Sequence, residues 1–250
     1  MISKAKIKLI QSLKYKKNRD KHGLFVAEGK KTIEELLETK LSAVEIFGTQ
    51  KVLSQLAIQK EITITEASNS EIKKITHLST PTEIVGLFRI PENDLTNSFR
   101  TNFVLVLDGV QDPGNLGTII RLADWYNIKS IVCSENSVDA YNPKVIQSTM
   151  GSIFRVKVYY TDLLPFIEQA KRNEFTLYGS FMNGESIYTK SFDEKKMLIM
   201  GNEGKGISSE IEKLMDKKIS IPTFFNEGDG PESLNVAIAS AIIVSEMKRG

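Results

Sequence analysis

The chain has one cysteine, two histidines and one tryptophan among its 250 residues. A single cysteine excludes an internal disulfide, and so few thiol and imidazole groups argue against a structural zinc site. Cys133 follows two apolar residues, a setting that predicts a buried, inert thiol rather than a nucleophile. No apolar run approaches the length of a membrane span, and the N-terminus lacks the apolar core of a signal peptide. We therefore expect a cytoplasmic protein with no metal and no membrane contact.

Charge is distributed unevenly along the chain. The net charge is +2, but residues 1–31 carry ten Lys or Arg and two acidic residues, a formal charge of +8. The remaining 219 residues therefore sum to −6. A segment this basic is either a solvated helix face or an arm that binds the phosphates of a nucleic acid. Charge alone does not decide between these two interpretations.

Strand-like and helix-like segments alternate throughout, which predicts an α/β protein. A polar stretch follows Pro91, and its residues 93–101 read as a linker between an N-terminal domain, residues 1–92, and a C-terminal domain, residues 102–250. In the N-terminal domain we expect helices at 4–14, 30–39, 51–59 and 69–76, and strands at 23–29, 43–48, 61–65 and 84–90. In the C-terminal domain we expect strands at 103–107, 129–133, 155–159, 175–180, 197–201 and 218–221, and helices at 115–126, 143–148, 161–172, 208–215 and 233–248. The mostly apolar strands of the C-terminal domain predict a parallel sheet covered on both faces.

The glycine-rich turns fall late in the C-terminal domain. The first strand–helix turn, residues 108–117, lacks the G-x-G-x-x-G pattern of a dinucleotide-binding domain. Instead, a glycine-rich turn closes the segment 198–206, and a second segment runs from Ile219-Ser220-Ile221-Pro222 to Ser233-Leu234-Asn235-Val236-Ala237. Before both comes the strand 104–108 with its helix 115–121. Each motif alone is weak, because apolar strands that end in glycine turns are common.

Taken together and in this order, the three motifs resemble those of the SpoU (TrmH-like) branch of the SPOUT RNA methyltransferases. Residues 14–37 likewise resemble the family's N-terminal RNA-binding domain, which is similar to RNA-binding ribosomal proteins. The resemblance implies a C-terminal SPOUT domain with a deep trefoil knot, and a homodimer. It also implies S-adenosylmethionine as cofactor and methylation of a ribose 2′-hydroxyl in structured RNA, with ribosomal RNA favoured over transfer RNA.

The resemblance also assigns the site residues. The catalytic set is Arg121, Asn115, Glu203, Ser233 and Asn235. The set that binds the cofactor is Gly201, Asn202, Gly204, Ile221, Ser233, Leu234 and Ala237. A guanidinium is a poor base, so we interpret Arg121 as a donor to the 2′-hydroxyl or to the adjacent phosphate, with Glu203 beside it to orient it. For Asn115 and Ser233, a helix N-cap is the purely structural alternative.

The basic segment supplies the predicted RNA contacts. These are Lys14, Lys16, Lys17, Arg19 and Lys21. One departure from the family pattern lies between Pro222 and Ser233, where ten residues, 223–232, replace about six. This departure leaves one wall of the predicted cofactor pocket undefined.

Three other functions remain open at this point. The first is 2′-O-methylation of transfer RNA, and the second is methylation of a guanine ring nitrogen. The third is a non-catalytic RNA-binding or ribosome-assembly protein that keeps the fold. Asn115, Arg121 and Asn235 together favour the ribose-modifying branch over methylation of a base. Intact polar residues in all three motifs argue against a non-catalytic protein.

Overall fold

The protein is described here by a computed structural model, which covers residues 1–39, 42–57, 62–224 and 232–249. The chain divides into two compact units. Unit 1 comprises Met1–Glu92 and Asp139–Phe154, and unit 2 comprises Asn93–Val138 and Arg155–Gly250. This division differs from the predicted domain boundaries mainly at 139–154, which fold with the N-terminal residues. The predicted linker contains a short 3-10 helix, η1 (Leu95–Arg100), and belongs to unit 2.

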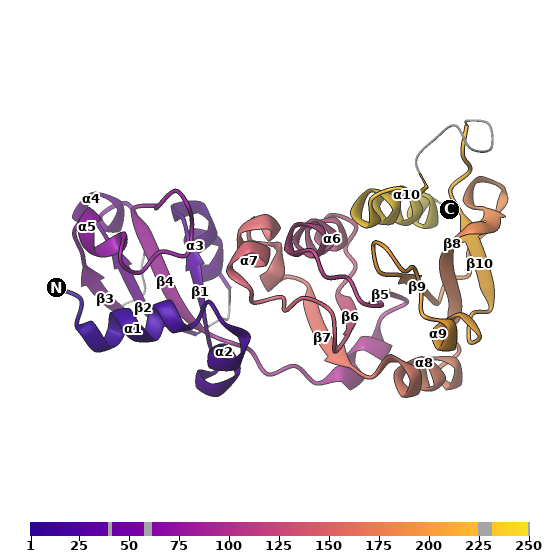
Figure 1. Ribbon diagram of the computed structural model, residues 1–250, viewed down its shortest axis with the longest axis horizontal. Helices are drawn as coiled ribbons and strands as arrows, with labels where there is room; N and C mark the ends of the chain where they lie inside the picture. The colour runs from indigo at the N-terminus through magenta and orange to yellow at the C-terminus, as the bar shows by residue number, and fades with distance from the viewer. Residues whose placement is uncertain (40–41, 58–61, 225–231, 250) are drawn as a thin grey trace. The chain divides into compact units, whose positions relative to one another are not determined.

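Unit 1 is built on a four-stranded sheet with the order β1-β4-β2-β3 (Figure 1). β4 (Ile84–Arg89) pairs antiparallel with β1 (Leu24–Glu28) and with β2 (Ala43–Gly48), while β3 (Thr63–Glu66) pairs parallel with β2. Its helices are α1 (Lys4–Ser12), α2 (Lys16–His22), α3 (Lys30–Leu37), α4 (Gln50–Leu53), α5 (Asn69–Ile72), α7 (Pro143–Thr149) and η2 (Ser152–Phe154). The sheet is therefore mixed, and it matches the small α/β domain that the sequence predicts.

Both faces of β1 are buried, and its successive side chains point to opposite faces of the sheet. Leu24 and Val26 belong to the core that contains Ile10 and Leu13 of the N-terminal segment. Phe25 points to the other face, where its ring lies 5.0 Å from that of Tyr141 and 6.3 Å from that of Phe154, centroid to centroid. Residues 139–154 thus complete a core that the N-terminal residues begin.

Unit 2 contains a six-stranded sheet in which every neighbouring pair is parallel, and this confirms the predicted parallel sheet. The order is β10-β8-β9-β5-β6-β7. The strands are β5 (Phe103–Leu107), β6 (Ser130–Ser134), β7 (Lys157–Thr161), β8 (Thr176–Ser186), β9 (Lys196–Met200) and β10 (Lys217–Ser220). The helices are α6 (Pro113–Trp125), α8 (Leu163–Arg172), α9 (Ser209–Glu212), α10 (Val236–Arg249) and the 3-10 turn η3 (Ile187–Thr189).

Helices cover both faces of this sheet. Within unit 2 of Figure 1, α6 and α10 lie side by side, and α8 lies on the other side of the strands. Val104 and Val106 of β5 pack in one cluster with Phe166 and Ile167 of α8. All residues of β5 and β9 are buried, because both strands lie inside the sheet. In the described part of the chain, no helix combines the length and the apolar character that crossing a bilayer requires.

The order of the strands creates a switch point between β5 and β9. From β5 the chain moves to β6 and β7 on one side, whereas β9, β8 and β10 lie on the other side. The connections that leave β5 and β9 therefore diverge and open a crevice at the carboxyl ends of these strands, where open α/β sheets bind ligands. The turns after β5 and β9, which carry two of the three sequence motifs, meet at this crevice.

Candidate active site

The turn after β5 is joined to its neighbours through the backbone. The Asp108 N–H donates to the Met200 carbonyl at 2.9 Å, and the Asp108 carboxylate accepts from the Ser208 N–H at 2.8 Å. Gly109 has a φ of 76°, a left-handed conformation that favours glycine, and its N–H donates to Ser134 Oγ at 2.8 Å. These contacts fix the start of the β5–α6 connection against strands on both sides of it.

The turn after β9 requires a glycine at its first position. A Cβ on Gly201 would lie 2.1 Å from the Gly206 carbonyl carbon and 2.3 Å from the Ile207 nitrogen, both of them backbone atoms. The turn is closed by reciprocal backbone hydrogen bonds of 2.9 and 3.0 Å between Asn202 and Gly206. At Gly204, by contrast, a Cβ would meet nothing nearer than 3.8 Å. The two glycines therefore have different roles in the turn.

Asn202 joins the two turns. Its side-chain oxygen accepts from the N–H groups of Gly204 and Lys205, each at 3.0 Å. This fixes the orientation of the amide, so that its nitrogen donates to the Gly109 carbonyl at 2.7 Å. The predicted cofactor residue Asn202 thus lies at the switch point and holds the two turns together.

Glu203 accepts hydrogen bonds from the connection that leads into α6. Its carboxylate accepts from the Gln111 N–H at 3.3 Å, from the Asp112 N–H at 3.2 Å and from Asn115 Nδ2 at 3.0 Å. Partial burial opposes ionisation of this carboxyl group. The hydrogen bonds from Asn115 and from the backbone outweigh that effect and hold the pKa of Glu203 below its usual range.

Asn235 connects this carboxylate to the C-terminal helix. Its side-chain oxygen caps α10 by accepting from the N–H groups of Ala237 at 2.9 Å and Ile238 at 3.3 Å. Its nitrogen donates to Asn115 Oδ1 at 2.8 Å. The α10 N-terminus, Asn235, Asn115 and Glu203 therefore form one hydrogen-bonded chain, which we call the amide relay. The hydrogen bonds to its two neighbours in this chain fix the orientation of each side-chain amide.

The capping residues differ from those considered on sequence grounds. α6 begins at Pro113, and its cap is Asp112, whose carboxylate accepts from the Asn115 N–H at 2.9 Å. Asn115 and Ser233 are therefore not N-caps, since Asn235 caps α10. The Asp112-Pro113 pair is a start signal that would have predicted this cap, since proline is favoured at the first position of a helix. Gly109, Gln111 and Asp112 also belong to the site, although none of them is among the predicted residues.

Arg121 lies on α6, six residues after Asn115, and its side chain is exposed. Among the described residues none forms a hydrogen bond or ion pair with its guanidinium. The expectation that Glu203 orients Arg121 is therefore wrong in this structure, because the carboxylate is held by Asn115 and by backbone N–H groups. The guanidinium of Arg121 keeps all its donors available for a ligand.

The remaining predicted cofactor residues follow β10 or precede α10. Ile221 comes directly after β10 and is half-buried, Ser233 and Leu234 are exposed, and Ala237 is buried in the first turn of α10. Leu234 exposes 46% of its surface. Of the insertion at 223–232, residues 225–231 lie outside the described part of the chain.

The predicted RNA contacts separate into two groups. Lys14, Lys16, Lys17 and Lys21 are exposed, as phosphate contacts require. Arg19 is only 2% exposed, and both Nε and Nη2 donate to Asp139, Nε at 2.8 Å. The prediction that Arg19 binds RNA is therefore wrong in this structure. A charged side chain this deeply buried needs its partners within the protein.

Two further features lie outside the amide relay. A cavity of about 410 Å³ in unit 2 is lined partly by Phe103, Lys129, Lys196 and Lys248, at the amino ends of β5 and β9. This is the opposite edge of the sheet from the switch point, so the cavity is not the predicted cofactor site. Among the described residues, no three His, Cys, Asp or Glu side chains form a group that could hold a metal ion. Cys133 is buried, and burial raises the pKa of its thiol.

Comparison with known proteins finds related sequences for both units of the chain. The family model for the SpoU rRNA Methylase family matches residues 102–245, and the model for the MRM3-like substrate binding domain matches residues 4–86. The 23S rRNA (guanosine(2553)-2′-O)-methyltransferase RlmP of Bacillus subtilis is 31% identical over 244 residues, 97% of this chain and 96% of that protein.

Solved structures agree with the sequence relatives. A protein of the TrmH family of RNA methyltransferases from Porphyromonas gingivalis is 34% identical, with a TM-score of 0.88 and coverage of 100% of this chain and 99% of that one. The AdoMet-bound rRNA methyltransferase from Sinorhizobium meliloti is 27% identical, with a TM-score of 0.85 and coverage of 100% and 97%. The similarity thus extends over both units and not over the sheet of unit 2 alone.

Proposed function

Because this chain belongs to the SpoU rRNA methylase family, we propose that it uses S-adenosylmethionine to methylate a ribose 2′-hydroxyl of ribosomal RNA. The observation that carries the proposal is the amide relay at the switch point of the unit 2 sheet. Residues of all three sequence motifs meet there through hydrogen bonds of 2.8 to 3.0 Å between Asn235, Asn115 and Glu203. A non-catalytic protein that kept the fold would have no need of such a connected polar network.

The residues present fit the cofactor. S-adenosylmethionine supplies an activated methyl group when it is bound. The turn 201–206 contains three glycines, of which Gly204 and Gly206 are exposed, and Leu234 offers an exposed apolar surface of the kind that an adenine ring covers. Gly201, Asn202, Gly204, Ile221, Ser233, Leu234 and Ala237 are the residues that would hold it.

The protein contributes alignment and charge to the transfer. The amide relay fixes Asn115 and Glu203, so these groups need no reorganisation when the substrate ribose arrives. Glu203 is ionised at neutral pH and its lowered pKa makes it a weak base, which assigns it to positioning rather than to proton removal. Arg121 donates to the ribose hydroxyl or to the neighbouring phosphate, where its positive charge favours loss of the hydroxyl proton.

The exposed lysines of unit 1 bind phosphates of the same RNA. Lys14, Lys16, Lys17 and Lys21 present four ammonium groups on a segment of eight positions, 14–21. Phosphate contacts of this kind provide affinity, and the unpaired bases of a structured RNA provide the choice of site. The match of residues 4–86 to a substrate-binding domain supports this assignment.

The homodimer, the deep trefoil knot and the cytoplasmic location also belong to this proposal. Support for the homodimer comes from two exposed apolar side chains on the packed helices α6 and α10: Trp125 is 85% exposed and Ile238 is 52% exposed. A second copy that packed over α6 and α10 would remove such side chains from water. Sedimentation of the wild type and of Trp125→Glu tests the dimer, and a monomeric wild type contradicts it.

Transfer of labelled methyl groups tests the activity itself. Purified protein is incubated with methyl-labelled S-adenosylmethionine and unmodified 23S rRNA or transfer RNA, in buffer with and without a chelator. We expect label in 23S rRNA, at one position that becomes resistant to alkaline cleavage because its 2′-oxygen is blocked. Label in transfer RNA alone would favour the second substrate class, label on a base would exclude the ribose reaction, and loss with chelator would contradict a metal-free site.

A further inference from the structure

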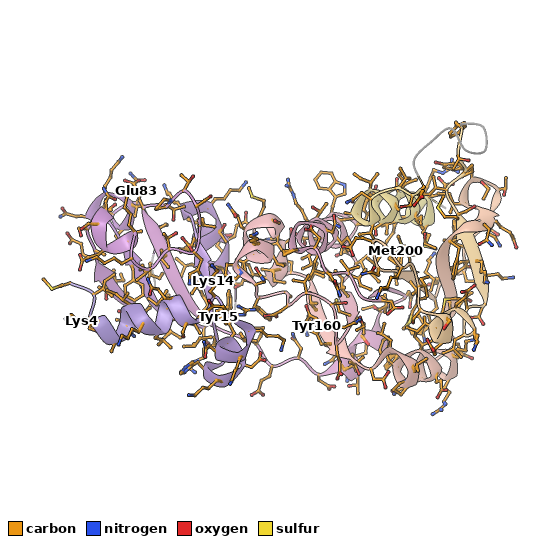
Figure 2. All side chains as sticks on the ribbon, viewed as in Figure 1. Lys4, Lys14, Tyr15, Glu83, Tyr160 and Met200 are labelled. Atoms are coloured by element: carbon orange, nitrogen blue, oxygen red, sulfur yellow. The ribbon has the colours of Figure 1, made fainter. Side chains whose placement is uncertain are left out.

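The turn between α1 and α2 presents an aromatic ring among lysines. Tyr15 is 65% exposed and is flanked by Lys14, Lys16 and Lys17, all of which are exposed. We call these four residues the basic turn; Figure 2 labels Lys14 and Tyr15 at this position of unit 1. Tyr15 occupies the cap position of α2 but makes no capping hydrogen bond with its side chain. Local structure therefore gives no reason for an aromatic residue here.

The backbone of the basic turn is held rigidly from within. Four successive carbonyl groups, those of residues 12–15, all accept hydrogen bonds. Ser12 accepts from the Tyr15 N–H at 3.1 Å and from Asn18 Nδ2 at 3.0 Å, and Tyr15 accepts from the Asn18 and Arg19 N–H groups at 3.1 and 3.2 Å. The turn therefore needs no ordering by a ligand, and it presents its side chains from a fixed backbone.

The buried Arg19 completes this arrangement. Its Nη1 donates to the Leu13 carbonyl at 2.8 Å and to the Lys14 carbonyl at 2.9 Å, while Asp139 accepts from the rest of the guanidinium. The carbonyl dipoles of the turn are thus directed at a buried positive charge instead of at solvent. A phosphate that approaches the turn from outside meets ammonium groups and a tyrosine ring, not carbonyl oxygens.

A second segment adds positive charge beside α1. Gln11 Nε2 donates to the Lys74 carbonyl at 2.8 Å, and the exposed side chains of Lys73 and Lys74 follow α5. Of the four ammonium groups at Lys14, Lys16, Lys17 and Lys21, one is paired, since Lys16 lies 2.7 Å from Asp20. That pair is exposed, so breaking it when a phosphate competes for Lys16 costs little.

From these observations we infer that Tyr15 stacks on an unpaired base of the substrate RNA while the lysines around it bind the flanking phosphates. The inference rests on the proposed function for the identity of the ligand. An aromatic ring on a rigid basic surface is the combination that single-stranded nucleic acids need, because every base has a face to stack and every linkage carries a charge. A protein partner would need carboxylates placed opposite the lysines, whereas every linkage of an RNA already carries the required negative charge. Arg19 is then a positioning residue for this contact.

Binding of defined RNAs to three variants tests the inference. The probes are a hairpin with an unpaired loop and a fully paired duplex of the same length, titrated against full-length protein at several salt concentrations. Tyr15→Ala should bind the hairpin about ten-fold more weakly, as expected for the loss of one stacked base. Tyr15→Phe should stay within about two-fold of the wild type, since it keeps the ring. Tyr188→Ala, which removes a tyrosine 49% exposed in unit 2, is the matched control.

The salt dependence of RNA affinity distinguishes a stacking contact from a contact with a phosphate. Tyr15→Ala should leave the slope of log affinity against log salt unchanged, because a stacked ring releases no counterions. Lys17→Ala should lower that slope by a little under one, as expected for one lost phosphate contact. Equal hairpin affinity of Tyr15→Ala and the wild type, or an equal loss for Tyr15→Phe, would overturn the inference. So would a loss of the same size on the duplex, which has no unpaired base.

Methyl transfer to 23S rRNA is measured with the same preparations, so that a failure of the stacking inference can be distinguished from a failure of the proposed function. If the wild type methylates the RNA and Tyr15→Ala matches it in both binding and KM, stacking is refuted while the activity stands. If the wild type binds the hairpin through Tyr15 but transfers no methyl group, the activity is refuted while the stacking stands.

Discussion

The side-chain nitrogen of Asn235 donates a hydrogen bond to the side-chain oxygen of Asn115 at 2.8 Å, although 120 positions separate the two residues. The oxygen of Asn235 is already committed to the N-terminus of α10, so only its nitrogen faces Asn115. Asn115 in turn has only its nitrogen left for Glu203. Neither amide can turn over without losing bonds at both of its ends.

Asn115→Asp should reduce kcat/KM for methyl transfer by about 10- to 100-fold, which corresponds to the loss of one hydrogen bond to a charged group. The new carboxylate would face that of Glu203 and repel it. Steady-state rates with 23S rRNA measure the effect. Asn173→Asp makes the same charge change at the end of α8, outside the amide relay, and should keep wild-type rates. Equal rates for both variants would show that the relay has no part in the reaction.

Glu203 should remain ionised at a more acidic pH than an ordinary glutamate. Its pKa is lowered in the folded protein, so its hydrogen bonds stabilise the fold fully above the pKa of an unfolded glutamate. That contribution is lost as the pH falls through the lower folded pKa. Titration of the side-chain carboxyl carbon by NMR measures the pKa directly, and Glu203→Gln identifies the signal. A pKa above the ordinary value would contradict the hydrogen bonding described here.

Arg121→Ala should lower methyl transfer by at least about 100-fold while cofactor affinity stays within a few-fold, because the proposed ligand of the guanidinium is the RNA and not the cofactor. Arg121→Lys should not restore the rate, since an ammonium lacks the planar pair of donors. Arg172→Ala, at another exposed arginine of unit 2, serves as the control. Calorimetry with S-adenosylhomocysteine accompanies the rates, and parallel loss of binding and rate would instead assign Arg121 a structural role.

Gly201→Ala should abolish cofactor binding, whereas Gly204→Ala should leave it nearly unchanged. The added methyl group at 201 collides with backbone at 2.1 Å and forces the turn open, but at 204 the nearest atom is 3.8 Å away. Calorimetric titration of both variants with S-adenosylhomocysteine gives the comparison. Similar affinities for the two would mean that the shape of the turn does not define the pocket.

Arg19→Ala should lower the free energy of unfolding by about 3–5 kcal/mol, the usual cost of removing one partner from a buried ion pair. Asp139 and two carbonyl groups would lose their donor. Lys17→Ala, an exposed neighbour, should change stability by less than about 0.5 kcal/mol. Urea denaturation followed by circular dichroism measures both. Arg19→Ala with wild-type stability would return Arg19 to the set of RNA contacts.

Local patterns in the sequence predicted the parallel sheet and the glycine turns that follow its strands. The strands around the glycine turn at 201–206 are short apolar runs that end in obligatory turn residues, and such signals lie within one segment. The relay could not be derived that way, because it joins side chains 88 and 120 positions apart. The resemblance to a family named the residues, but not which group donates to which.

In the basic segment, 14–21, the local sequence shows the charges but predicts neither the helix nor which side chain is buried. Its sequence, KKNRDKH over α2, has no apolar period, so neither the helix nor the burial of Arg19 could be predicted from it. α2 ends at Gly23, which adopts a left-handed φ of 61°. Arg19 is buried because Asp139 and the carbonyls of Leu13 and Lys14 accept from it. A count of charges treats Arg19 and Lys17 alike, whereas only the fold distinguishes the inward side chain from the outward one.

The division of the chain into alternating segments limits how this protein can be dissected. Unit 1 is assembled from Met1–Glu92 and Asp139–Phe154, with residues of unit 2 between them. A fragment that starts at residue 93 carries 139–154 without Phe25, whose ring packs against Tyr141 at 5.0 Å. Such a fragment exposes apolar surface and leaves Asp139 without Arg19. A chimera that exchanges unit 1 with that of a relative must therefore be joined at three places, after residues 92, 138 and 154, for its core to be inherited whole.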